Sequence, residues 1–147
     1  MTASRPSDCP LCQRILRLGE RSDSALIHEF PQSYWLVGEH QFFHGYTLLL
    51  HKAHVRELHD LSPAVSQAFY DELMIASRAV AAVCAPWKMN VSSFGNQVPH
   101  LHWHLMPRYD DDPERLRPPW DFSSQFAAHL TSPAEAAALA SRLRAAL

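Results

Sequence analysis

Three histidines at alternate positions have the clearest capacity for chemistry: His100, His102 and His104. In a β-strand, side chains two residues apart point to the same face, roughly 6.6 Å from one another. The residues between and after them are apolar and can anchor such a strand in a core: Leu101, Trp103 and Leu105. Imidazole can act as a nucleophile, an acid or base, or a metal ligand. The pattern predicts a reactive strand face, and it leaves open whether the histidines attack a substrate or hold one catalytic zinc ion.

Cysteines form the second group with chemical potential. Cys9 and Cys12 make a C-x-x-C pair near the N-terminus. In a reducing compartment such a pair more often binds a metal or has redox activity than forms a structural disulfide. Cys84 lies near the end of an apolar helical pattern, so we expect it to be a small buried hydrophobic residue.

The elements that must position these residues can be predicted from apolar spacing and turn residues. Five strands are expected, at 25–30, 34–38, 46–51, 87–94 and 100–107. Three helices are expected, a short one at 9–18, a long one between the cap Ser62 and Pro86, and a last one at 132–146. The last helix begins with a capping box, Ser132 to Glu135. This order predicts an α+β domain with a mostly antiparallel sheet and packed helices.

Composition excludes several classes of protein. The chain has 147 residues, 47% of them hydrophobic, and a net charge of −2, so we expect one domain over 1–147. This charge does not favour binding to nucleic acid or to an anionic membrane. No apolar run is long enough to span a bilayer, and the first residues do not resemble a secretory signal, so a cytoplasmic location is expected.

The charged, proline-rich segment 110–119 is expected to be irregular. Four other histidines are expected at the surface or at strand edges: His28, His40, His51 and His59.

Two stretches resemble the histidine triad (HIT) family. Residues 90–108 (NVSSFGNQVPHLHWHLMPR) are similar to the family signature, in which three histidines alternate with apolar residues. Residues 45–55 (GYTLLLHKAHV) are similar to its glycine, apolar strand and His-Val segment. With the C-x-x-C, which many bacterial members carry, the resemblance covers about Cys9 to Tyr109. The sequence of the triad segment is most similar to that of bacterial members of the diadenosine tetraphosphate hydrolase type.

This resemblance implies an enzyme that hydrolyses or transfers nucleotides. The middle histidine of the family attacks the α-phosphate and forms a nucleotidyl-histidine, which water then releases as a nucleoside monophosphate. That role falls on His102, with His104 directed at phosphate oxygens or the leaving group and His100 beside them. A phosphate-contacting amide falls on Asn96 or Gln97. The implied substrates are dinucleoside polyphosphates or nucleoside phosphoramidates, and the implied assembly is a homodimer.

The resemblance also implies a structural Zn²⁺ site. In members with the C-x-x-C, both cysteines, the histidine of the His-Val segment and the first triad histidine hold zinc. The matching residues are Cys9, Cys12, His54 and His100. Two thiolates and two imidazoles complete a closed tetrahedral site, which is typical of structural zinc.

Two positions depart from the family pattern. Many relatives have a histidine immediately after the glycine that opens the third strand, where this chain has Tyr46. The ribose-binding aspartate or asparagine of relatives falls near Gly38 and Glu39, and Glu39 is the expected ribose contact. Two other functions stay open from the sequence: a metallohydrolase that uses all three triad histidines, and a nucleotide-binding regulatory module with incidental turnover.

Overall fold

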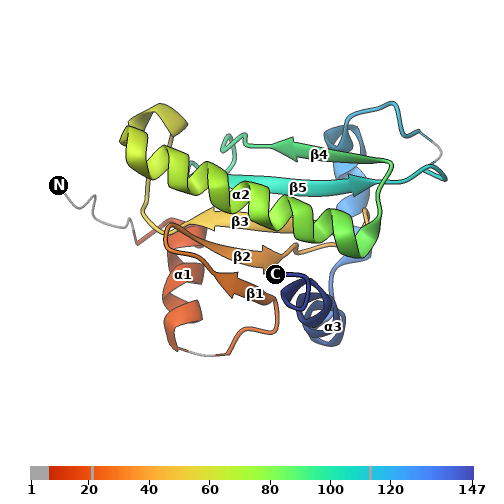
Figure 1. Cartoon of the computed structure of the whole chain (residues 1–147), viewed down its shortest axis with the longest axis horizontal. Helices are drawn as coiled ribbons and strands as arrows, with labels where there is room; N and C mark the ends of the chain where they lie inside the picture. Colours follow the sequence, from red (N-terminus) through yellow and green to blue (C-terminus); the bar gives the residue numbers. More distant parts are fainter. Residues whose placement is uncertain (1–6, 21, 113) are drawn as a thin grey trace.

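A five-stranded antiparallel sheet in the order β1-β2-β3-β5-β4 forms the centre of the computed structural model, which describes residues 7–20, 22–112 and 114–147 (Figure 1). The strands are β1 Leu26–Glu29, β2 Ser33–Val37, β3 Thr47–His51, β4 Lys88–Ser92 and β5 His102–Arg108. All four pairings between neighbouring strands are antiparallel. The expected α+β class, with its mostly antiparallel sheet, is confirmed.

Two helices cover one face of this sheet and enclose the main hydrophobic core. Helix α2 (Pro63–Cys84) begins after Ser62, whose side chain accepts a hydrogen bond from the Val65 amide, and it ends where Ala85 takes the left-handed conformation. Helix α3 (Pro133–Arg144) begins with the predicted capping box. The core between these helices and the sheet includes buried residues from four strands and both helices: Ile27, Trp35, Leu49, Phe69, Val80, Leu105 and Leu139.

The described residues cover the opposite face of the sheet at its two ends. Helix α1 (Pro10–Glu20) packs Ile15 and Leu18 against Leu36 and Leu50. The 3-10 helix η2 (Pro119–His129) packs Phe122 against a second group of buried residues at the other end, which contains Tyr46 and Met106. Residues 130–131 continue from η2 and tie it to the β2–β3 loop, because Thr131 donates hydrogen bonds to the carbonyls of Glu39 and Gly38. Between the two ends the sheet face is left accessible.

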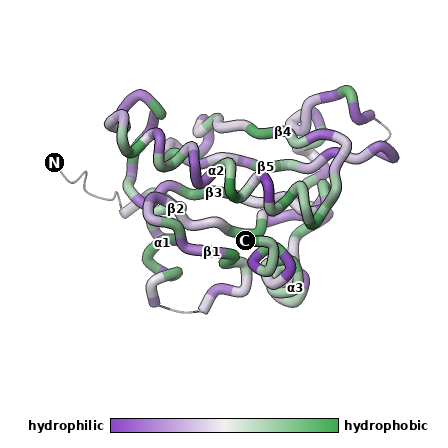
Figure 2. Tube along the Cα trace, in the orientation of Figure 1, coloured by the Kyte–Doolittle hydropathy of each residue, from purple (hydrophilic) through white to green (hydrophobic). Residues whose placement is uncertain are grey.

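Most element boundaries fall within a few residues of the sequence prediction, with two differences. Strand β5 begins at His102 rather than at residue 100, because His100 turns back to bond the Val98 carbonyl through its amide. The 3-10 helices η1 (Leu58–Asp60) and η2 were not predicted. The segment that joins β5 to η2 is irregular and largely hydrophilic, as expected (Figure 2). No helix among the described residues is long and apolar enough to cross a membrane.

Candidate active site and metal centre

Four side chains from distant parts of the sequence converge where α1 meets the start of β5. They are Cys9, Cys12, His54 and His100, and one ligand atom from each lies within 4.8 Å of all the others. The C-x-x-C spans the start of α1, so the first turn of the helix directs both sulfur atoms to one side. Cys9, Cys12 and His100 are buried, while His54 is partly exposed. Sequence reasoning had placed these four residues together only through the family resemblance.

The spacing of these atoms fits a tetrahedral zinc ion. Bonds of about 2.3 Å to sulfur and 2.0–2.1 Å to nitrogen place tetrahedral ligands about 3.3–3.8 Å apart. The Cys12 sulfur lies 3.3 Å from His54 Nδ1 and 3.4 Å from His100 Nδ1. The Cys9 sulfur lies 3.7 Å from His100 Nδ1, and the two Nδ1 atoms are 3.3 Å apart. The donor set and its geometry therefore suit zinc, with all four positions taken by protein.

His100 is oriented as a metal ligand should be. Its Nε2 donates to the His51 carbonyl at 2.8 Å, which leaves the lone pair on Nδ1 directed at the cysteines. Burial and the neighbouring His54 lower the pKa of His100 to about 4, so the ring is neutral near pH 7. His100 is fully buried and does not line the pocket described below. Its ring therefore belongs to the cluster with Cys9, Cys12 and His54 rather than to the strand face that carries His102 and His104.

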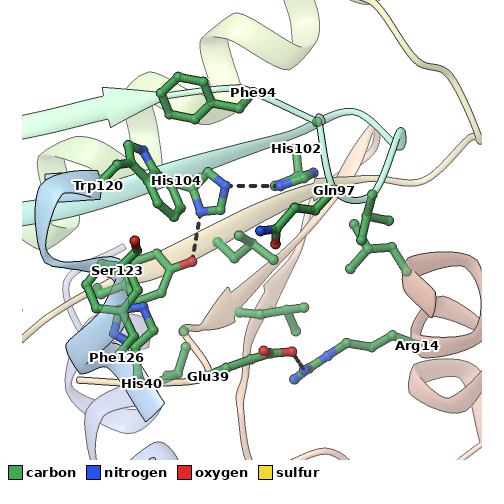
Figure 3. A pocket seen from close by; sticks show the side chains of 18 of the residues that line it. Arg14, Glu39, His40, Phe94, Gln97, His102, His104, Trp120, Ser123 and Phe126 are labelled. Carbon is green, nitrogen blue, oxygen red and sulfur yellow. Dashed lines mark hydrogen bonds and ion pairs between the residues drawn. The ribbon is translucent and has the colours of Figure 1, made fainter. Parts of the chain in front are cut away.

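His102 and His104 stand on β5 and face the uncovered part of the sheet. Their Nε2 atoms lie 3.0 Å apart (Figure 3). His102 Nδ1 donates to the His100 carbonyl at 2.6 Å, which leaves its Nε2 with a lone pair when the ring is neutral. Cross-strand neighbours Leu50 and Leu48 support the two rings from β3. Only 8% and 9% of the surfaces of His102 and His104 are exposed, so both rings are held firmly.

The surroundings of these rings favour their neutral forms. Burial lowers the pKa of His102, against the hydrogen bond to the His100 carbonyl, which raises it. Burial together with His102 and His40 lowers the pKa of His104 to about 3. At neutral pH the pair thus offers nucleophilic or hydrogen-bonding nitrogen atoms rather than positive charge.

Both rings open into a pocket of about 650 Å³, within the usual size range of ligand sites. Helix α1 forms one end of it with Leu11 and Arg14, and η2 forms the other end (Figure 3). Among the described residues that line the pocket, Arg14 is the only lysine or arginine, and it is engaged with Asp23 at 3.5 Å and Glu39 at 3.7 Å. The pocket thus combines two imidazoles with a mainly apolar lining.

An aromatic wall beside His104 was not predicted. It consists of Phe94, Trp120 and Phe126. Trp120 meets the edge of the His104 ring with centroids 4.8 Å apart, and it contacts both other members of the wall. Its indole N–H donates to Ser92 at 3.3 Å. Two members come from η2, for which the sequence carries no regular apolar spacing, so periodicity offered no signal for the wall.

The three predicted substrate-binding residues all line the pocket. Asn96 and Gln97 lie on the exposed loop between β4 and β5, and the side chain of Gln97 extends beside His102 (Figure 3). Glu39 lies across the pocket, paired with Arg14, and its side chain is 80% exposed. Glu39 adjoins His40 in the chain, and its side chain extends toward Arg14 (Figure 3).

The expectation that His40 and His51 lie at the surface is wrong. His40 is buried beneath η2, where it stacks on Phe126 with centroids 3.9 Å apart. His51 is buried against Phe69, and its carbonyl accepts the hydrogen bond from His100. Both residues sit at strand ends that later segments cover. His28 and His59 are exposed, as expected.

The geometry does not support a metal ion held by all three triad histidines. The His100 ring turns into the cysteine cluster, while His102 and His104 meet in the pocket. Among the described residues, the group of Cys9, Cys12, His54 and His100 is the one His, Cys, Asp and Glu cluster of three or more suited to a metal ion. The metallohydrolase alternative loses the ligand set on which it depended.

The comparisons with known proteins agree with this architecture. The family model described as HIT domain matches residues 20–111, more than half of the chain. The chain therefore belongs to the HIT family, whose members bind nucleotides. A search of the curated proteins found no significant match.

Solved structures of HIT proteins share the fold over nearly the whole chain. A HIT-like protein from Bartonella henselae has 19% identity and a TM-score of 0.73, covering 98% of this chain and 100% of that one. A histidine triad protein from Bradyrhizobium japonicum has 27% identity and a TM-score of 0.70, covering 88% and 92%. A zinc-bound histidine triad family protein from Mycobacterium smegmatis has 19% identity and a TM-score of 0.68, covering 95% and 92%.

Proposed function

We propose that this protein is a nucleotide hydrolase or transferase that attacks the α-phosphate of its substrate with His102. One observation carries the proposal: the Nδ1 proton of His102 is committed to the His100 carbonyl, so the Nε2 lone pair faces the pocket. A nucleophile held this way needs no separate base to present its lone pair.

The reaction proceeds in two displacements. The Nε2 lone pair of His102 forms a bond to the α-phosphorus, and the bond to the leaving group breaks with its electron pair. Water then attacks the nucleotidyl-histidine, the P–N bond breaks, and a nucleoside monophosphate leaves with the water oxygen. Splitting one difficult displacement into two in this way is the usual advantage of covalent catalysis.

Pocket residues bind the two parts of the nucleotide. His104 Nε2 lies 3.0 Å from the attacking nitrogen, which supports a contact with the phosphoryl group. Gln97 or Asn96 supplies an amide to the same group from the loop above it. Glu39, beside Arg14, can accept hydrogen bonds from ribose hydroxyls.

Dinucleoside polyphosphates such as diadenosine tetraphosphate are the proposed substrates. The pocket volume suits a nucleotide, and the aromatic wall offers stacking surfaces for a base. A second candidate is a nucleoside phosphoramidate, in which an amine leaves. The scarcity of positive charge in the pocket favours this candidate over a polyphosphate. Arg14 is the only lysine or arginine among the described lining residues, and it already faces two carboxylates.

The products of diadenosine tetraphosphate cleavage test the proposal. Attack at the α-phosphorus must yield AMP and ATP, with labelled water oxygen in the AMP. Two molecules of ADP would mean attack at another phosphorus and would refute the mechanism. If diadenosine tetraphosphate is inert while adenosine phosphoramidate turns over, the mechanism holds and the second candidate is correct. A comparison with diadenosine triphosphate completes the substrate series.

We also propose that Cys9, Cys12, His54 and His100 hold a structural Zn²⁺ ion. The closed donor set and the interatomic distances support this assignment. When bound, the metal supplies cross-linking between the N-terminal helix and the start of β5. Paired thiolates are stable in a reducing compartment, which supports a cytoplasmic location.

A homodimer is the proposed assembly. Strand β4 is an edge of the sheet, and Trp87 and Val91 on or beside it are exposed. Such an edge can pair with a second copy. Light scattering during size-exclusion chromatography tests this, and a monomer at micromolar concentration would contradict it.

A further inference from the structure

Tyr46 occupies a buried position directly behind the reactive histidines. Its hydroxyl lies 2.8 Å from His104 Nδ1 (Figure 3). Only 5% of its surface is exposed. The backbone of Tyr46 is fixed on both sides, because its amide donates to the Phe43 carbonyl and its own carbonyl accepts from the Gly38 amide. The ring lies so close over Gly38 that any Cβ there would overlap it.

The hydrogen bonds running from Tyr46 to the His100 carbonyl have only one consistent direction. A carbonyl can only accept, so His102 Nδ1 carries a hydrogen, and in the attacking form its Nε2 carries the lone pair. His104 Nε2, 3.0 Å away, must then be the donor. His104 Nδ1 is consequently an acceptor, and the hydroxyl that meets it is the donor. This series of hydrogen bonds therefore selects one tautomer of His104, with its proton on Nε2.

This series of hydrogen bonds keeps its protons and does not transfer them to the substrate. Burial raises the pKa of Tyr46, which keeps the phenol protonated. Loss of a proton from neutral His104 to a substrate would leave either an imidazolate or a tyrosinate, and a buried site disfavours both anions. A neutral imidazole can instead polarise an oxygen through a hydrogen bond, without transferring the proton.

The position of His104 indicates which oxygen it contacts. An attacking nitrogen lies roughly 3–3.5 Å from the phosphorus, and the leaving atom lies beyond it, in line. In-line attack leaves the non-bridging oxygens nearer to the attacking nitrogen than the leaving atom is. His104 Nε2 lies 3.0 Å from that same nitrogen. Its N–H therefore reaches a non-bridging phosphoryl oxygen rather than the leaving atom.

We propose that Tyr46 is a positioning residue that locks His104 in the Nε2–H tautomer. When His102 Nε2 bonds to phosphorus, it no longer accepts from His104, and the same N–H then donates a hydrogen bond to a non-bridging α-phosphoryl oxygen. This inference rests on the proposed attack by His102. It also gives the departure at position 46 a function, because a tyrosine hydroxyl that stays protonated is a constant donor.

Kinetics of Tyr46→Phe test the role, because the change removes the hydroxyl and keeps the ring over Gly38. We expect kcat to fall about 5- to 20-fold, as for loss of one hydrogen bond that orients a donor, with KM within about twofold. The fall should be equal for the 4-nitrophenyl and phenyl esters of AMP, whose leaving groups differ in basicity. Tyr109→Phe is the matched control, because its hydroxyl donates to the His44 carbonyl outside the pocket, and its kcat should be unchanged. A larger fall for the phenyl ester would show that His104 serves the leaving group and would overturn the inference.

Nitrogen NMR of the imidazole rings tests the tautomer without substrate. We expect the full wild-type chain to show His104 protonated at Nε2, and Tyr46→Phe to show a mixture of both tautomers. A wild-type spectrum with the proton on Nδ1 would overturn the inference even if turnover is normal. Absence of AMP formation by the wild type would instead refute the proposed function, and the spectrum would still decide the tautomer.

Discussion

The two ends of the His100–His104 segment use the same side chain in opposite ways. At the first end, the His100 ring is fully buried and its Nδ1 lies among the donor atoms of Cys9, Cys12 and His54, a set that could fill all four positions of a tetrahedral metal ion. At the other end, His102 and His104 direct their Nε2 atoms into an open pocket with no thiolate beside them. Residue type alone does not separate these uses. What separates them is whether the remaining lone pair faces a closed donor set or an accessible cavity.

Substitution of the proposed nucleophile should give the largest effect. For His102→Ala we expect kcat to fall by about 10⁶-fold with the fold retained, because no other group takes over the covalent step. Steady-state turnover and circular dichroism check this. Wild-type-like activity in the purified variant would contradict the proposed role of His102. Mass spectrometry that locates the nucleotidyl adduct on another residue would contradict it as well.

Breaking the metal centre should affect stability more than chemistry. For Cys12→Ser we expect loss of about one zinc per chain and about 3–5 kcal/mol of stability, or roughly 10–15 °C in Tm. The kcat at low temperature should change far less than in His102→Ala. Cys84→Ser is the matched control, since Cys84 lies outside the cluster, and it should keep its zinc. Elemental analysis that finds no zinc in wild type, and no affinity for added zinc, would contradict the assignment.

Acid should destabilise the pocket wall through His40. Burial, with a smaller effect of His129, lowers the pKa of His40 from its ordinary value of 6.5 to about 4. The unfolded chain therefore binds the proton first, and stability is lost as the pH falls from about 6.5 to about 4. The loss amounts to about 3 kcal/mol.

The variant His40→Phe keeps the stacking on Phe126 and removes the titration. Denaturant unfolding across that pH range should show a shallower slope for it than for wild type. The exposed His59 provides the control, and His59→Gln should keep the wild-type slope. An unchanged slope in His40→Phe would show that the buried ring does not contribute.

The smallest effect is expected for Gly38→Ala, where an added methyl group must displace the Tyr46 ring. We expect a loss of about 1–2 kcal/mol of stability and a reduction in kcat similar to that of Tyr46→Phe. Gly19→Ala in α1 is the control, because nothing lies within 4 Å of its added Cβ, and it should be neutral or stabilising. Full activity in Gly38→Ala would show that the ring position is not critical.

Local patterns in the sequence predicted most of the fold. Apolar alternation placed the strands, and Ser62 and Ser132 marked the starts of both long helices. The pairing of His102 with His104 followed from strand geometry alone, whereas the four metal ligands were brought together only by the family resemblance. Burial of His40 depends on η2, about 80 residues later in the chain, and periodicity carries no information about such a contact.

The family-model match at residues 20–111 includes His102 and His104 but leaves out both ends of the pocket. Arg14 and Leu11 precede the matched region, and Trp120 and Phe126 follow it. The two ends of the pocket are therefore supplied by stretches of chain outside the matched region, while Glu39, Asn96 and Gln97 lie within it. Exchange of η2 for a segment with different side chains would therefore change the surface proposed to stack a base, while His102 and the His100 carbonyl that it bonds stay in place.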